Sequence, residues 1–316
     1  MCGSTQWAVI INLKSGKKHF RRQMLYLFHQ LNNAGIDYVH QFTEFAGHAV
    51  LIARNFARNG HRKLLVIGGD GTISEVVNGI FSAGVATDNF KLALIPRGTG
   101  NDWARFWGLN RDYKQAIEVF IAGKTKAIDI GTVQFTLENE EMRHYFINSV
   151  GFGLDAAVVR ATHRLKRFTG SHSFLYFIAL LSAVFRYRSF RFQLKTNNLD
   201  IRDVLFTMNI ANGCYSGGGM KQNPDALPYD GILDAMFVRK PSFRDIVTAL
   251  PTLFKGTLHH HPALESFRTR QLELSYHNGG YFEADGIIVH CDSPLQIVLL
   301  HHAIQMVVPA ETQGNN

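Results

Sequence analysis

The sequence has few cysteines and no long apolar segment, and both shortages exclude classes of protein. Its cysteines, Cys2, Cys214 and Cys291, lie far apart in 316 residues, a pattern that favours a reducing cytosolic compartment over a disulfide framework or a zinc site. The longest apolar run, residues 174–184, is about a dozen residues long, whereas a bilayer-spanning helix needs roughly 20. The first residues also lack the basic start and long apolar stretch of a signal peptide. We therefore expect neither an integral membrane protein nor a secreted disulfide protein.

Charge is modest in amount but unbalanced in sign. Charged residues make up 18% of the chain and hydrophobic residues 46%, values typical of a folded globular protein. Lysine and arginine number 33 against 25 aspartates and glutamates, so the net charge is +8. This excess favours an anionic partner, although charge alone does not choose among nucleotide, nucleic acid and membrane.

The pattern of apolar runs changes near residue 130, which divides the chain in two. Up to that point short apolar runs alternate with longer helical patterns, which is typical of a doubly wound parallel α/β sheet. The expected strands are residues 7–12, 38–42, 64–67 and 92–95, and the expected helices are residues 20–32, 46–58, 73–81 and 102–107. We predict an α/β domain over residues 1–130.

Strand-like runs dominate the rest of the chain and predict a mainly antiparallel β domain over residues 131–316, whose last strand can return to the first domain. The expected strands here are residues 144–150, 204–211, 233–238, 272–276 and 296–300, with helices over residues 156–165 and 174–187. The length of the chain fits two domains on the usual scale.

A glycine-rich turn follows the third expected strand, at the sheet edge where an open parallel sheet places its ligand site. It reads Gly68-Gly69-Asp70-Gly71-Thr72. Glycines let backbone N–H groups approach a phosphate, and the amides at the start of the next helix point to the same place. Thr72 with Glu75 has an alternative interpretation as a capping box. The motif is neither a Walker loop nor a dinucleotide fingerprint, because Ser74 stands where the last glycine of the fingerprint belongs.

Polar turns follow the other expected strands as well. The fourth strand leads into Pro96-Arg97-Gly98-Thr99-Gly100-Asn101-Asp102, the first into Lys14-Ser15-Gly16-Lys17-Lys18, and Thr43 closes the second. Four such turns at one sheet edge predict a cradle for a triphosphate.

These motifs together resemble the catalytic domain of the diacylglycerol kinase, sphingosine kinase and bacterial YegS-type lipid kinase family. Three further segments agree with the resemblance: Asn12-Leu13-Lys14-Ser15-Gly16, with Leu13 in place of the family's proline; Asn148-x-x-Gly151-Phe152-Gly153-Leu154-Asp155; and Pro224-Asp225-Ala226 followed by Asp230-Gly231-Ile232-Leu233-Asp234. The first glycine motif alone is shared with NAD kinases and 6-phosphofructokinases, so the resemblance implies a fold of that kind for the first domain.

The resemblance implies ATP-dependent phosphorylation of a lipid hydroxyl with Mg²⁺ as cofactor. The residues that it and the polar turns assign to the nucleotide are Asn12, Ser15, Gly16, Thr43, Gly68, Gly69, Asp70, Gly71, Thr72, Glu75, Gly98, Thr99, Asn101 and Asp102. Asp70 is the expected catalytic residue beside the phosphates and Mg²⁺. A structural Mg²⁺ is implied at the Asp230 side chain and the Leu227 and Ile232 carbonyls, since hard oxygen ligands suit this ion; a β-turn built on Asp230-Gly231 is the alternative.

One departure from the family concerns the general base. The family's Asp-Gly-Glu, whose glutamate is taken as the base, reads Asp285-Gly286-Ile287 here. An isoleucine cannot accept a proton, which leaves the identity of the base and the retention of activity open. Asp285 is our preferred base because it keeps its place beside Gly286, with Glu283 and Asp70 as alternatives and a turn-forming role as the competing interpretation.

The leading hypothesis is a cytosolic lipid kinase, peripheral at the inner membrane surface, that phosphorylates diacylglycerol or a related lipid in the cleft between its two domains. Basic residues flank the apolar stretch 174–185 and predict contact with an anionic membrane: Arg160, Arg164, Lys166, Arg167, Arg186, Arg188 and Arg191. The alternatives are a lipid- or nucleotide-binding protein that has lost catalysis, and a NAD kinase. Nucleic-acid binding is not expected because basic and aromatic residues do not interleave, and a homodimer stays open.

Overall fold

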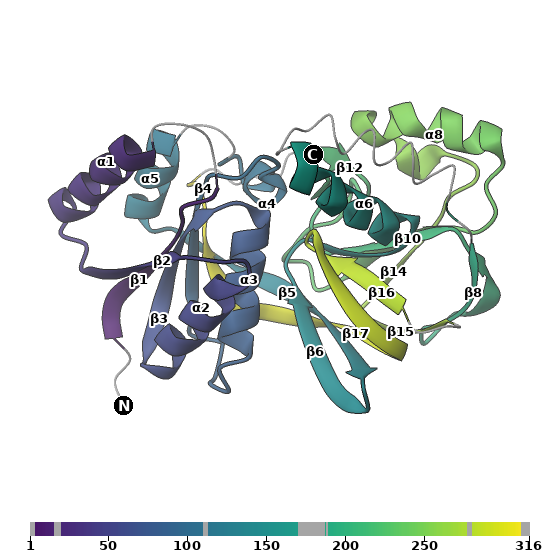
Figure 1. Ribbon diagram of the computed structural model, residues 1–316, viewed down its shortest axis with the longest axis horizontal. Coiled ribbons are helices and arrows are strands. Elements are labelled where there is room, and N and C mark those ends of the chain that lie inside the picture. The colour runs from purple at the N-terminus through teal and green to yellow at the C-terminus, as the bar shows by residue number, and fades with distance from the viewer. Residues whose placement is uncertain are drawn as a thin grey trace. The chain divides into compact units, whose positions relative to one another are not determined.

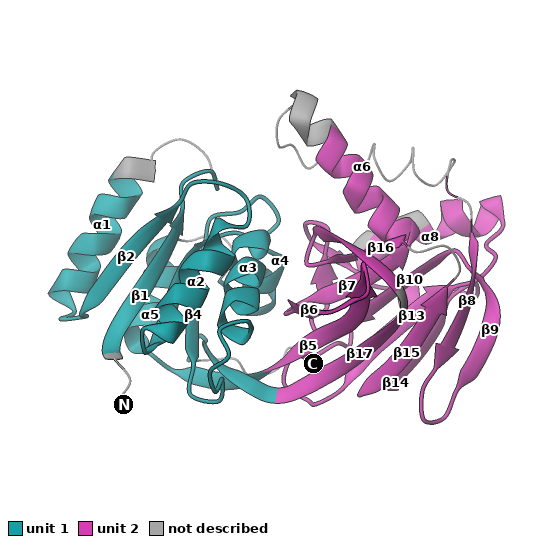
Figure 2. Ribbon diagram, turned by 60° about the horizontal axis from the view of Figure 1, so that its bottom comes forward, with its two compact units in different colours: residues 1–128, 302–316 teal, residues 129–301 magenta. Residues whose placement is uncertain are grey.

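The computed structural model describes residues 4–15, 20–109, 113–169, 187, 189–276 and 280–310. The predicted helix over residues 174–187 lies outside the described residues except for Tyr187. The chain forms two compact units (Figure 2): unit 1 comprises residues 1–128 and 302–316, and unit 2 comprises residues 129–301.

Unit 1 is a parallel sheet with helices between its strands (Figure 1). Its elements in chain order are β1 (Ser4–Asn12), α1 (Phe20–Asn33), β2 (Tyr38–Thr43), α2 (His48–Arg58), β3 (His61–Gly68), α3 (Asp70–Phe81), β4 (Lys91–Pro96), α4 (Asp102–Phe106) and α5 (Tyr113–Ala122). The strand order is β4-β3-β1-β2, and the end of β17 (Ile287–Val307) adds a further parallel strand beside β4. The predicted doubly wound α/β domain is confirmed.

Successive residues of the unit 1 strands are buried on opposite faces of the sheet, which explains their continuous apolar runs. Val9 and Ile11 of β1 pack in one cluster with Leu27 of α1 and Ile117 of α5. The neighbouring Ile10 is also fully buried. On α3, Gly79 allows contact with α2, because a β-carbon there would lie 2.5 Å from the Val50 carbonyl oxygen.

Unit 2 is built mainly from antiparallel strands. Its strands are β5 (Thr125–Leu137), which begins in unit 1, β6 (Glu140–Phe146), β7 (Ser149–Gly153), β8 (Phe190–Lys195), β9 (Asp200–Leu205), β10 (Thr207–Ala211), β11 (Tyr215–Ser216), β12 (Met220–Lys221), β13 (Leu233–Val238), β14 (Glu265–Thr269), β15 (Gln271–Tyr276) and β16 (Gly280–Ala284), together with the first part of β17. Its helices are α6 (Leu154–Thr169), α8 (Phe243–Lys255) and the short 3₁₀ helix η1 (Leu258–His260).

Three sets of unit 2 strands meet at β17. The first runs β14-β13-β10-β7-β16-β17, the second continues from β17 through β15 and β8 to β9, and the third is β5 with β6. Strands β11 and β12 pair only with each other. A single apolar core draws side chains from the sets that meet at β17, for example Phe152 of β7, Phe192 of β8 and Phe237 of β13. The predicted antiparallel β domain is confirmed.

Helix α8 was missed by the sequence pattern because Pro251 lies inside it. Its start is fixed by a capping box in which the Ser242 hydroxyl accepts from the Asp245 N–H while the Asp245 carboxylate accepts from the Ser242 N–H. None of the helices among the described residues is long and apolar enough to span a membrane.

Candidate functional site

The carboxyl ends of the unit 1 strands bring the predicted polar turns together. Asn12 at the end of β1 is the register partner of Thr43 at the end of β2. The Asn12 side chain donates to the Thr72 hydroxyl at 2.9 Å and accepts from the Lys14 N–H at 3.0 Å. Ser15 Oγ donates to the Asn12 carbonyl at 2.7 Å. The turn after β1 is therefore tied to the first turn of α3.

Two of the predicted phosphate-binding glycines serve packing. A β-carbon on Gly69 would lie 2.7 Å from the Gly98 Cα, and one on Gly98 would lie 2.6 Å from the Gly69 Cα. The Arg97 N–H donates to the Gly68 carbonyl at 2.7 Å, and the Asn101 side chain bonds both the N–H and the carbonyl of Gly98. Close contact between the turns after β3 and β4 requires glycine at these places.

Gly71 is different, because neither close packing nor backbone conformation requires a glycine at this position. A β-carbon there would meet nothing within 4 Å, and Gly71 is not among the residues with positive φ. It lies in the first turn of α3. The Thr72 N–H in this turn donates to the Gly69 carbonyl at 2.9 Å, whereas the N–H groups before it are at positions that have no partner within a helix. The open space beside this backbone fits a phosphate group.

The capping-box interpretation of Thr72 and Glu75 is wrong. Helix α3 begins at Asp70, and its N-cap, Gly69, has no side chain to cap it. The Glu75 carboxylate instead accepts from the Gly47 N–H at 3.0 Å and the Ala49 N–H at 3.2 Å, at the start of α2. These contacts join α2 to α3 and do not support the predicted nucleotide contact of Glu75.

Asp70 is half-buried at the first position of α3. Its Oδ1 accepts from the Trp103 N–H at 3.0 Å, at the start of α4. Burial raises the pKa of Asp70, and the backbone N–H groups of Trp103 and its neighbours lower it in part. Asp102, which was also predicted for the nucleotide site, is buried, and its Oδ1 lies 3.8 Å from Arg105 Nε. Thr99, predicted for the same site, is exposed. Gly16 lies outside the described residues.

Arg97, between Pro96 and Gly98, has a role that its place in the sequence did not predict. It is only 7% exposed, and its guanidinium donates to the Ser15 carbonyl at 3.1 Å and to the Gln23 side chain. Burial lowers the pKa of Arg97. Arg97 holds the turn after β1 and places a buried cation at the predicted phosphate edge.

In unit 2, Asp285 has a structural role. Asp285 and Gly286 have φ values of 49° and 79°, as in the two-residue hairpin turn that favours Asp-Gly. The Asp285 carboxylate accepts from the N–H groups of Ile147, Asn148 and Ser149 at 2.9, 2.9 and 3.2 Å. Both of its oxygens are engaged, which disfavours Asp285 as a general base.

Glu283 and Asp155 form a buried carboxyl pair. A β-carbon on Gly151 would lie 2.4 Å from Asp155 Oδ2 and 2.7 Å from Glu283 Oε1. The two carboxyl groups therefore lie close to the same side of Gly151. Asn209 Nδ2 donates to Asp155 Oδ2 at 2.8 Å. Burial raises the pKa of both carboxyls, and the charge of Asp155 raises that of Glu283 further.

Glu283 does not occupy the place of the family glutamate. In the β16–β17 hairpin, Glu283 pairs with Ile288 while Ala284 pairs with Ile287. Successive residues of a strand face opposite sides, so Glu283 and Ile287 lie on opposite faces of the hairpin.

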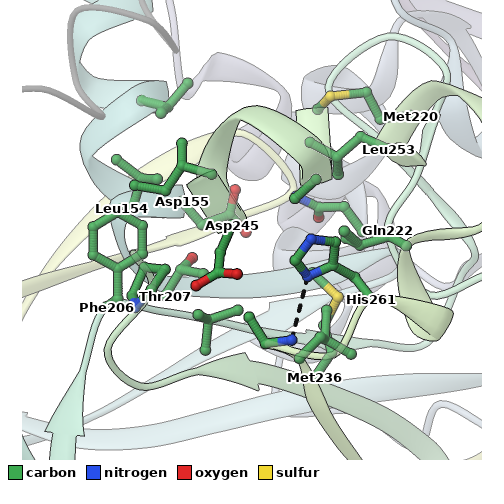
Figure 3. Close-up of a pocket in the computed structure, with 18 residues that line it drawn as sticks. Leu154, Asp155, Phe206, Thr207, Met220, Gln222, Met236, Asp245, Leu253 and His261 are labelled. Carbon is green, nitrogen blue, oxygen red and sulfur yellow. Dashed lines mark hydrogen bonds between the residues drawn. The ribbon is translucent and has the colours of Figure 1, made fainter. Parts of the chain in front are cut away.

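An apolar pocket lies within unit 2, between α6, α8 and strands β10 and β13 (Figure 3). Its cavity volume is about 110 Å³, and the pocket is partly open to solvent. The residues that line it are Leu154, Asp155, Val158, Phe206, Thr207, Met220, Gln222, Met236, Val238, Pro241, Asp245, Ile246, Ala249, Leu253, Leu258, His261, Ala263 and Leu264. Asp155 and Gln222, which are hydrogen-bonded to each other, add polar groups to the mainly apolar wall of the pocket. The pocket can therefore hold an aliphatic chain with a hydroxyl-bearing end.

The predicted metal ligands of unit 2 do not fit Mg²⁺. Asp230 Oδ2 lies 2.6 Å from Arg268 Nη2, so a guanidinium already neutralises this carboxylate. The Leu227 carbonyl accepts from the N–H groups of Tyr229 and Asp230 at 2.8 and 3.4 Å. Asp230 Oδ1 accepts from the Ile232 N–H at 3.1 Å, which agrees with the alternative of a hydrogen-bonded turn.

Comparison with known proteins gives the same relatives for both units. Residues 6–133 match the diacylglycerol kinase catalytic domain, and residues 148–308 match the YegS C-terminal NAD kinase beta sandwich-like domain. YtlR of Bacillus subtilis (strain 168) is 27% identical over 296 residues, which cover 90% of this chain and 94% of that protein. The diacylglycerol kinase of Staphylococcus aureus (strain MRSA252) is 27% identical over 281 residues, 88% of this chain and 84% of that protein. A crystal structure from Bacillus anthracis str. Sterne, at 22% identity, has a TM-score of 0.78 and covers 96% of this chain and 97% of its own, a likeness of fold.

Proposed function

Since this chain belongs to the diacylglycerol kinase and YegS family of lipid kinases, we propose that it transfers the terminal phosphate of ATP to a hydroxyl group of diacylglycerol or a related lipid. The observation that carries the proposal is the apolar pocket of unit 2 with Asp155 and Gln222 in its wall. A NAD kinase has no use for such a pocket, because its substrate is polar throughout.

Unit 1 supplies the nucleotide site in this proposal. The backbone N–H groups at the start of α3 bind the phosphates beside Gly71, where space is open. Asn12 and Ser15 hold the turn after β1 against them, and Arg97 contributes positive charge. Asp70 would hold Mg²⁺, which when bound neutralises the charge that develops on the phosphates.

Unit 2 supplies the acceptor site. The apolar walls of its pocket bind the acyl chains, and Asp155 and Gln222 offer an acceptor and a donor to the polar end of the lipid. The pocket excludes water from the aliphatic part, so most of the binding free energy comes from apolar burial.

The proton of the acceptor hydroxyl has no carboxylate at position 287 to receive it. Phosphoryl transfer depends mainly on positioning and charge neutralisation, whereas a general base contributes about 10²–10⁴ in rate. We therefore infer a slow lipid kinase. The competing candidate, a lipid-binding protein without catalysis, is favoured by the same two observations, namely Ile287 and the engaged Asp285.

The predicted membrane segment 174–185 lies outside the described residues, and α8 offers a further apolar surface for contact with a membrane. Phe243 and Val247 are 65% and 49% exposed, and Pro251, four residues on, is also exposed. These three residues lie on one stripe of the helix, while Ile246 and Leu253 line the pocket. A helix that is apolar on two faces suits a protein that takes its substrate from a lipid surface.

The test is incubation of the purified protein with ³²P-labelled ATP, Mg²⁺ and a panel of diacylglycerol, phosphatidylglycerol, sphingosine, ceramide and NAD. A labelled lipid supports the proposal, and labelled NADP supports the NAD kinase. If lipids bind but no acceptor is labelled even after long incubation, the protein is the non-catalytic lipid-binding candidate.

A further inference from the structure

An arginine bridges the two carboxylates of the turn over residues 227–234 in unit 2. Arg268 Nη2 lies 2.6 Å from Asp230 Oδ2, and Arg268 Nε lies 3.0 Å from Asp234 Oδ1. Asp234 on β13 and Arg268 on β14 are directly opposite each other in the antiparallel pair. Strand register therefore delivers the guanidinium to the turn.

The same turn is held from its other side by Asp129. The Gly231 N–H donates to Asp129 Oδ2 at 2.8 Å, and His301 Nδ1 lies 2.8 Å from Asp129 Oδ1. Gly231 has a φ of 77°, and a β-carbon there would lie 3.0 Å from the His301 ring. These hydrogen bonds hold the turn at Gly231.

The Arg268 guanidinium lies between two carboxylates, those of Asp230 and Asp234. A planar guanidinium can bond two carboxylates in a fixed geometry. A divalent ion at the Asp230 carboxylate would do the same work through oxygen ligands.

We propose that Arg268 takes the place of the structural Mg²⁺ that the family resemblance implies, so that unit 2 maintains this turn without a metal ion. Any Mg²⁺ requirement of the protein then belongs to the nucleotide site of unit 1. This inference concerns the stability of unit 2, and it holds whether or not the protein phosphorylates a lipid.

The test is thermal unfolding of the full chain without nucleotide, in EDTA and in millimolar MgCl₂. We expect the Tm of the wild type to be the same in both. Arg268→Met, which keeps the apolar stem and removes the charge, should lower the Tm in EDTA by about 2–4 °C, and Mg²⁺ should restore part of the loss through the freed carboxylates. Arg270→Met is the matched control, because Arg270 is exposed and no ion pair of its side chain is found among the described residues.

Two results would overturn the inference. One is a wild-type Tm that rises with Mg²⁺ while the Tm of Asp230→Asn does not, because this places an ion at the turn. The other is an Arg268→Met variant whose Tm in EDTA equals that of Arg270→Met, because the guanidinium then stabilises nothing. Kinase assays do not enter either comparison.

Discussion

Gly69 and Gly98 lie back to back, with no room for a side chain on either. A β-carbon on one would come within 2.7 Å of the Cα of the other, a distance that backbone cannot relax cheaply. The turns after β3 and β4 are thereby locked together, and the start of α3 is fixed relative to that of α4.

The first prediction distinguishes Gly98, which packs against backbone, from Gly71, which is proposed to leave room for a phosphate. Gly98→Ala should lower stability by about 1–3 kcal/mol because its methyl group meets backbone. Gly71→Ala should leave the Tm unchanged, since its methyl group enters open space, but should weaken ATP binding about tenfold or more by filling the place of a phosphate. Thermal unfolding and nucleotide titration measure the two effects. Equal ATP affinity in Gly71→Ala and wild type would remove α3 from the phosphate site.

The second prediction concerns Asp70. Asp70→Asn keeps an oxygen that can accept from the Trp103 N–H, so the fold should persist. Nearly all phosphoryl transfer should be lost, because a neutral amide cannot replace a carboxylate in holding Mg²⁺. Asp70→Ala is the control that also loses the bond to α4. A Tm loss in Asp70→Asn with an activity loss only in proportion would make Asp70 structural.

The third prediction addresses the missing base. Ile287→Glu should raise the rate of lipid phosphorylation by about 10²–10⁴, measured as initial rate with saturating ATP. Asp285→Asn should instead destabilise the protein by about 1–3 kcal/mol, because an amide group cannot accept on both sides from the three N–H groups of residues 147–149. If Asp285→Asn unfolds like wild type yet abolishes turnover, Asp285 is the base after all.

The fourth prediction is a pH dependence of stability caused by Glu283. Burial and the charge of Asp155 raise its folded-state pKa well above the ordinary 4.5. The folded protein thus binds the proton more tightly, so stability from this group is complete below about pH 4.5 and is lost as pH rises through the folded-state pKa. Glu283→Gln, which cannot ionise, should have a higher Tm than wild type at neutral pH and a similar one at pH 4.

Glu140→Gln, on an exposed residue of β6, is the control for this measurement. A Tm difference between Glu283→Gln and wild type that does not change with pH would show that Glu283 is not the titrating group.

The fifth prediction concerns the exposed stripe of α8. Phe243→Ser combined with Val247→Ser should weaken binding to phosphatidylglycerol vesicles about tenfold or more, while activity on a dispersed short-chain diacylglycerol stays unchanged. Met142→Ser, which removes a 40% exposed side chain on β6, should not alter vesicle binding. Equal vesicle affinity in all three proteins would assign membrane contact to another surface.

The alternation of strands and helices in unit 1 was predictable because each strand is an apolar run ended by a turn. The roles of individual turn residues were less so. Glu75 reaches the start of α2, 26 residues earlier in the chain, and the apolar pattern around it contains no sign of this contact. Gly69 and Gly98 lie in motifs that are typical of phosphate-binding turns. Their contact with each other is a tertiary feature, which the sequence around either glycine does not reveal.

In unit 2, long-range hydrogen bonds interrupted two runs that we predicted as single strands. The run over residues 144–150 divides into β6 and β7 because the Asp285 carboxylate takes up the N–H groups between them. The run over residues 204–211 divides at Phe206, whose N–H donates to the Val238 carbonyl. The role of Asp155 could not be predicted from its motif, because its partner Glu283 lies more than a hundred residues away in the chain.

The end of strand β17 belongs to unit 1, which limits where the chain can be divided and recombined with relatives. Its end pairs Gln305 and Met306 with Lys91 and Leu92 of β4, and Val307 joins the unit 1 core. A fragment that stops at residue 128 would leave β4 as a bare sheet edge, prone to aggregation. In topological terms residues 129–301 are an insertion into the α/β fold of unit 1. On the proposed function, acceptor preference should be exchangeable between relatives by swapping this internal segment. Swapping everything after residue 128 would instead also replace the last strand of the unit 1 sheet.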